Sequence, residues 1–82
     1  MAMIGEIKLF AGMYAPRGWM ECNGQHLNCW NYMALYGIMG QQYGGDGMDM
    51  FALPNMTPVR DADGRGESRY IICVEGDYPV PP

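Results

Sequence analysis

The chain has 82 residues, of which 49% are hydrophobic and only 17% charged, and its net charge is −4. A negative chain lacks the basic surface that nucleic acids and anionic membranes attract, and no apolar run approaches the roughly 20 residues of a membrane-spanning helix. A single core in so short a chain rarely supplies more than about 3–5 kcal/mol, so we expect one domain that buries further apolar surface against a partner chain.

Two short strands are expected near the start of the sequence. Within residues 5–11, Ile7 and Leu9 point to one side and their neighbours to the other, which predicts a half-buried strand. A Pro-Arg-Gly turn separates this strand from a second one at 19–22, which the turn dipeptide Asn23-Gly24 ends. No basic segment followed by an apolar stretch precedes them, so we expect no signal peptide.

One helix is expected at about 29–39. Asn28 is a good N-cap residue, and the apolar residues of this segment recur at i, i+3, i+4 and i+7. These apolar residues are Tyr32, Leu35, Tyr36 and Met39. Gly40 follows, at the position where helices commonly end on a residue with positive φ.

The second half of the chain contains one further strand and much irregular structure. Residues 44–47 are too rich in glycine for a helix or a strand, and 51–54 are predicted to be extended because they lead into a proline. Residues 57–68 are polar and rich in turn-forming residues, whereas 69–75 form an almost continuous β-branched and aromatic run that predicts a strand buried on both faces. With an extended proline tail at 79–82, residues 1–82 are expected to form a single α+β domain of short antiparallel strands with one helix.

Several short segments occur in a characteristic order along the chain. They are GEIKLFAG at 5–12, APRGW at 15–19, CNGQ at 22–25, YGGDG at 43–47, FALPN at 51–55 and YIIC at 70–73. Their order and spacing resemble the phage tail collar family, which includes short tail fibre and microcystin-dependent-protein-like domains. The resemblance covers residues 4–55 and then about 70–79, and the segment between them is shorter than in typical members. It implies a small compact collar-like fold and a non-enzymatic structural component of a tail fibre or tail tip.

The sequence contains no recognisable catalytic set. His26 is the only histidine, and Ser68, the only serine, lacks the Gly-x-Ser-x-Gly elbow of hydrolases. We therefore expect no enzymatic activity and no cofactor.

Two cysteines and the single histidine give the pattern that comes nearest to a metal site. Cys22, His26 and Cys29 form C-x3-H-x2-C, but structural zinc sites need four ligands, usually in closely spaced pairs. We expect Cys22, Cys29 and Cys73 to be reduced, buried and free of metal; the alternative is a partial zinc site completed across an oligomer interface. The acidic run at 61–67 lacks later ligands of a calcium loop and is expected to be a solvated turn.

Two functions are compatible with the resemblance. In the first, the domain self-assembles into a homo-oligomer and contacts other tail or fibre proteins. A trimer is favoured because family members in tail fibres look trimeric, and a larger ring is the alternative. Exposed aromatic and Met side chains often anchor interfaces. The residues expected at this one are Trp30, Tyr32, Met48 and Met50, together with the proline tail at 79–82.

The alternative function is an adhesion module that binds a host surface receptor or glycan during host attachment. It is expected to use exposed aromatic side chains together with the loop at 57–69. The receptor-facing residues of this loop are expected to be Arg60, Asp61, Asp63, Arg65 and Glu67. Under either function we expect a virion tail protein that is made in the host cytoplasm.

Overall fold

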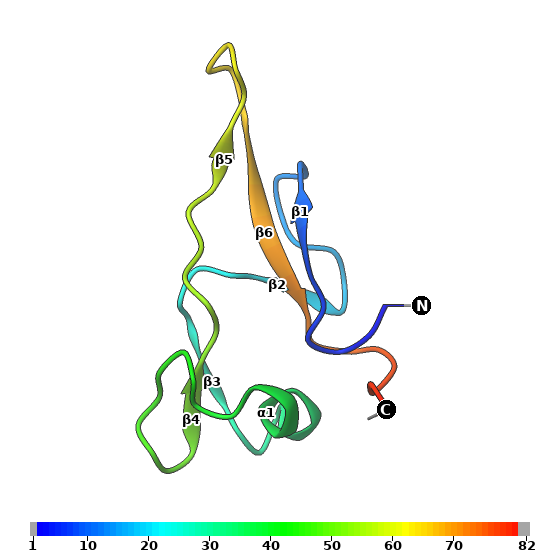
Figure 1. Cartoon of the computed structure of the whole chain (residues 1–82), viewed down its shortest axis with the longest axis vertical. Coiled ribbons are helices and arrows are strands. Elements are labelled where there is room, and N and C mark those ends of the chain that lie inside the picture. The colour runs from blue at the N-terminus through cyan, green and yellow to red at the C-terminus, as the bar shows by residue number, and fades with distance from the viewer. Residues whose placement is uncertain (1, 81–82) are drawn as a thin grey trace.

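The structure, a computed structural model, describes residues 2–80, and over these residues the chain forms six short strands and one helix (Figure 1). In chain order they are β1 (Ile7–Phe10), β2 (Trp19–Glu21), β3 (His26–Asn28), α1 (Met33–Met39), β4 (Met50–Ala52), β5 (Val59–Arg60) and β6 (Glu67–Cys73). All strand pairs are antiparallel, which confirms the predicted α+β fold of short antiparallel strands with one helix. Pro81 and Pro82, half of the expected proline tail, lie outside the described residues.

β6 is the centre of the larger sheet. β1 and β2 pair with it in the order β1-β6-β2, and β5 pairs with its first residues. Ile72 lies opposite both Ile7 and Met20, so these three side chains share one face of the sheet. The strand begins two residues before the predicted position 69, because its hairpin with β5 extends the ladder through the Val59–Ser68 pair.

A second, two-stranded sheet is formed by β3 and β4, with Leu27 opposite Phe51. Each strand has only three residues, too few to show a strand period, and the sequence predicted only that the region around Phe51 is extended. Both central side chains are buried, so this small sheet contributes directly to the core.

The helix begins at Met33 rather than at 29. Asn28 belongs to β3, and its Oδ1 accepts a hydrogen bond from the backbone N–H of Trp30 at 2.8 Å. Its carbonyl oxygen accepts a second one from Asn31 at 3.1 Å, so Asn28 stabilises a turn and not the helix. The C-terminal prediction is confirmed: Gly40 ends α1 with a φ of 58° and donates to the carbonyl oxygen of Tyr36 at 2.7 Å.

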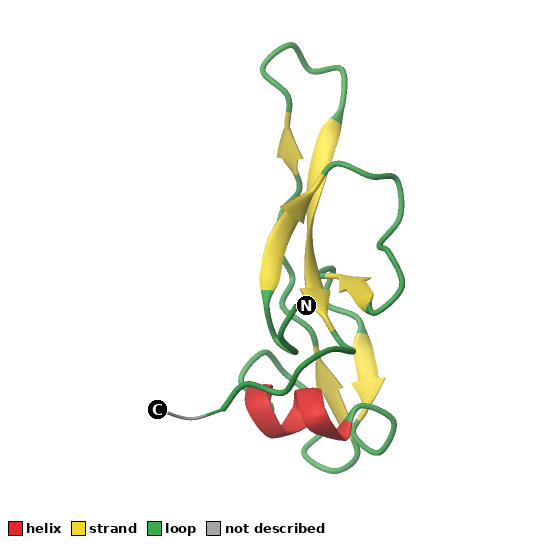
Figure 2. Cartoon of the chain, turned by 90° about the vertical axis from the view of Figure 1, so that its right-hand side faces the viewer, coloured by secondary structure: helices red, strands yellow, loops and turns green. Residues whose placement is uncertain are grey.

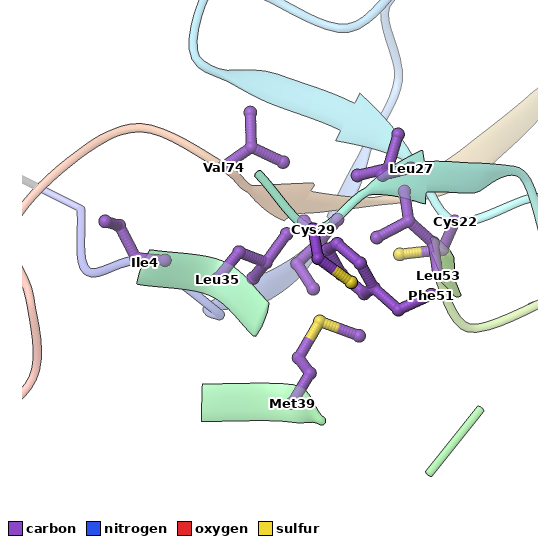
Figure 3. Packing of buried hydrophobic residues seen from close by; sticks show 10 residues of the cluster. Ile4, Cys22, Leu27, Cys29, Leu35, Met39, Phe51, Leu53 and Val74 are labelled. Atoms are coloured by element: carbon purple, nitrogen blue, oxygen red, sulfur yellow. The ribbon is translucent and has the colours of Figure 1, made fainter. Parts of the chain in front are cut away.

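The core lies at one end of the molecule, where α1, the β3–β4 sheet and the end of β6 meet (Figures 1 and 3). Its fully buried side chains include Leu35, Phe51, Leu53 and Ile72. The Tyr36 ring packs on Phe51 with 5.3 Å between the ring centroids. The β5–β6 hairpin extends away from this end, and the molecule measures 42 × 29 × 23 Å (Figure 2).

β1 is more exposed than its sequence pattern predicted. Ile7 and Leu9 keep 37% and 45% of their surface accessible, and Lys8 between them is exposed as well. The expectation of a half-buried strand is therefore wrong for the single chain. The physical reason is that β1 is an edge strand, which within the described residues pairs with β6 on one side only, so its side chains are covered from that side alone.

Candidate interaction surface

An apolar cleft opens beside the helix. Three parts of the chain form it: the turn that follows β3, one side of α1, and the loop that precedes β4. The lining residues are Cys29, Trp30, Met33, Tyr36, Gly37 and Met48, and the volume is about 210 Å³. We call this feature the Trp30 cleft.

The walls of the Trp30 cleft are held by backbone turns while their side chains stay accessible. The Asn28 side chain fixes the turn that carries Trp30, whose side chain is 73% exposed. Met33 follows three residues later at the start of α1 and is 63% exposed. Gly37, one helical turn further, also lines the cleft, and the position that its Cβ would take lies 3.4 Å from the hydroxyl of Tyr78.

The opposite wall of the cleft depends on Asp46. Its Oδ1 accepts hydrogen bonds from the backbone N–H groups of Met48, Asp49 and Met50, at 2.8, 3.1 and 3.0 Å. The bonds donated by Met48 and Met50 lower the pKa of Asp46, because they favour the charged carboxylate. Gln41 supports the same loop, since its Oε1 accepts from the N–H of Gly47 at 2.9 Å. The loop therefore presents Met48 with 83% of its surface exposed.

The structure brings only part of the predicted interface set together. Trp30 and Met48 line the cleft, whereas Tyr32 packs against the core and Met50 is half-buried in β4. Sequence reasoning missed Met33 as a lining residue. The available signal was its spacing of three from Trp30, because residues three apart lie on the same face of the helix predicted at 29–39.

The three cysteines are unpaired and buried. Burial raises the pKa of Cys22 to about 11, and it also raises the pKa values of Cys29 and Cys73. Buried thiols of this kind are poor nucleophiles and poor metal ligands, because the thiolate is the reactive form. Among residues 2–80, no three Cys, His, Asp or Glu side chains are grouped as a metal site requires.

His26 and Ser68 are not brought into one site. His26 is exposed on β3, in the two-stranded sheet, whereas Ser68 lies on β6 in the larger sheet. The part of the chain that the structure describes also holds no helix long and apolar enough to span a membrane.

A comparison of the sequence with models of known protein families shows which family the chain belongs to. A family model described as the Phage Tail Collar Domain matches residues 5–58, about two thirds of the chain. The chain belongs to the phage tail collar family. No curated protein and no solved structure matches it. The resemblance inferred from the motif order is thereby confirmed.

Family membership identifies a structural component of the virion tail. The matched region of this collar domain runs from just before β1 to Pro58, so it contains the Trp30 cleft and both walls that form it. The match ends immediately before β5, which places the β5–β6 hairpin outside the part that the family model describes.

The hairpin of this collar domain carries the residues predicted to face a receptor. Asp61 donates its backbone N–H to the carbonyl oxygen of Gly66 at 2.8 Å, which closes the hairpin loop. Arg65 Nε lies 3.4 Å from Asp63 Oδ2, and both side chains are largely exposed. A hollow of about 220 Å³ lies between Arg60, Gly64, Arg65, Gly66 and Glu67. The loop is at the opposite end of the molecule from α1 (Figure 1).

Proposed function

We propose that this collar domain is a non-enzymatic structural module of a phage tail fibre or tail tip that assembles with copies of itself, with a trimer as the favoured state. The observation that carries the proposal is the amount of apolar surface left uncovered in the matched region. Trp30, Met33 and Met48 are each more than 60% exposed around one cleft. A single chain gains no stability from exposed apolar side chains. Burial of this surface against another copy contributes about 25 cal/mol of favourable free energy per Å² of apolar surface.

The sheet supplies a second uncovered apolar area. Ile7 and Leu9 on β1 and Val59 on β5 are all exposed, at 37%, 45% and 43%. β1 pairs only with β6 within the described residues, so its other edge is open to a strand or a side chain of a neighbour. Cyclic symmetry would repeat each such contact around the assembly, which is how a small module gains stability beyond its own core.

Light scattering on the wild type and on Trp30→Ala tests this function. We expect the wild type to be a homo-oligomer at micromolar concentration. Truncation of a central aromatic anchor costs about 2 kcal/mol or more per site, so Trp30→Ala is expected to have a lower mass. Met13→Ala is the matched control, because Met13 is 91% exposed and lies outside the cleft. A wild type that stays monomeric at high concentration would remove the proposal.

A second candidate function rests on the hairpin. Its projecting loop holds two arginines at the rim of a hollow, an arrangement suited to an anionic group of a host surface receptor or glycan. If the domain has this function, a glycan array gives saturable binding that Arg60→Ala and Arg65→Ala both weaken. An array without any saturable signal would exclude glycans as the ligand.

A further inference from the structure

The Trp30 cleft has the character of a peptide site rather than a cofactor site. Its volume of about 210 Å³ is below the roughly 300–1,000 Å³ of typical small-molecule pockets. Its walls are the indole of Trp30, the thioethers of Met33 and Met48, and the ring of Tyr36. Aromatic-lined grooves of this kind bind proline-rich segments, which lie against the rings in an extended conformation.

The chain itself carries such a segment, and it begins beside the cleft. Asp77 is tied to the N-terminal residues, because it donates to the carbonyl oxygen of Ala2 at 3.0 Å and accepts from the N–H of Ile4 at 2.8 Å. Next along the chain, Tyr78 lies against α1: its hydroxyl is 3.4 Å from where a Cβ on Gly37 would stand, and Gly37 lines the cleft. Val80 follows with 88% of its surface exposed.

The segment is directed away from its own cleft. Tyr78 precedes Pro79 and Val80 precedes Pro81, and a residue before a proline disfavours the α region, which favours an extended course here. Accordingly, the described end of the chain leads outward past the helix (Figure 2). An occupant from the same chain would have to turn back from this outward course.

We propose that Pro79 and Val80, with the two prolines that follow them in the sequence, occupy the Trp30 cleft of a second copy of this chain. The inference rests on the proposed self-assembly and names the contact that drives it. The prolines are already restricted to an extended form, so binding costs little conformational entropy. The indole N–H of Trp30 is a donor suited to a backbone carbonyl of the segment. Each copy both donates a segment and accepts one, which generates a ring where the rotation between copies closes, and a trimer is one such ring.

Disulfide trapping between two single variants tests the contact. Val80→Cys and Met33→Cys are mixed in equal amounts under mild oxidation, and the linked peptides are identified by mass spectrometry. Any link between positions 80 and 33 then joins two different chains by construction. Both positions are exposed in the single chain, so the substitutions leave the core intact. The control pairs Val80→Cys with Met13→Cys, which is exposed outside the cleft.

We expect the 33–80 link to form at least roughly tenfold more than the 13–80 link, because a bound segment has a high effective concentration at the cleft. Light scattering on the same samples separates the two levels of the proposal. An oligomer without an excess of the 33–80 link overturns the segment contact and leaves self-assembly standing. A monomer overturns self-assembly and the contact together.

A second variant tests the same contact without added cysteines. Val80→Asp places a charge on a segment that is proposed to lie in an apolar cleft, and we expect it to weaken assembly by roughly tenfold or more. Met13→Asp adds the same charge at an exposed position outside the cleft and is expected to leave assembly unchanged. Equal assembly of Val80→Asp and the wild type would contradict the proposed contact.

Discussion

Asp46 shows how one side chain can fix the loop that forms a wall of the Trp30 cleft. A single carboxylate oxygen accepts three consecutive backbone N–H groups, which fixes a loop that is too rich in glycine to hold its shape through side-chain packing. The sequence predicted an irregular segment here. It did not show which oxygen atom accepts the hydrogen bonds from the backbone N–H groups of the loop. That depends on distances between atoms in the folded chain, which a sequence motif does not contain.

The charge of Asp46 gives the domain a pH dependence at acidic pH. Backbone hydrogen bonds hold the pKa of Asp46 below its usual range in the folded state, so this carboxylate stabilises the fold above its unfolded pKa of about 3.9. That contribution is lost as the pH falls through the unfolded value toward the lower folded one. Asp46→Asn keeps an acceptor oxygen without the charge. We expect the stability advantage of the wild type over Asp46→Asn to shrink below about pH 4 in thermal melts. Parallel stability curves for the two proteins between about pH 6 and pH 2.5 would contradict this account.

Gly45 occupies a position where a side chain has no room. Its φ is 147°, and a Cβ there would lie 2.5 Å from the backbone oxygen of Met50. Gly47 also has positive φ, 77°, but open space around it. We expect Gly47→Ala to cost about 1–2 kcal/mol from backbone strain, and Gly45→Ala to cost more because the β4 backbone must also move. Chemical denaturation at a fixed protein concentration compares the two, and equal losses would show that the close approach is unimportant.

At the scale of elements, local patterns predicted some structures well and others poorly. The β6 run and the Gly40 helix end were found from the sequence, because each depends on residues that are neighbours along the chain. The helix start was wrong, because Asn28 can cap a turn as readily as a helix and its pairing within β3 decides between them. The exposure of Ile7 and Leu9 was missed for a related reason: alternation shows that side chains share a face, but not whether anything covers that face.

α1 is anchored to the core by Leu35 and Met39, and Leu35 is the more deeply buried of the two. Leu35 has no accessible surface, whereas Ile38 on the same helix is 37% exposed. We expect Leu35→Ala to lower the free energy of unfolding by about 2–5 kcal/mol. Ile38→Ala is the matched control and should cost on the order of 1 kcal/mol or less. Urea titration measures both, and a similar loss for the two variants would contradict the assigned core.

At the scale of the whole molecule, the distribution of apolar surface matters most. The core is confined to one end, and several exposed apolar residues gather at the Trp30 cleft beside it and along the sheet. Met13 and Tyr14 are exposed elsewhere, in the loop between β1 and β2. Composition alone indicated a need for a partner, and the motif order indicated the family. The cleft itself was not predictable, because it combines residues from a turn, a helix and a loop whose proximity depends on the fold.

Sedimentation equilibrium of the wild-type chain tests the central claim most directly. If the uncovered apolar surface of this collar domain is an interface between copies, the mass at micromolar concentration is a multiple of the 9.2 kDa chain, and we expect it to be that of a trimer. The mass should fall toward that of one chain on dilution, because association follows mass action. A single species of one-chain mass at all concentrations, up to the highest that stays in solution, would contradict the account.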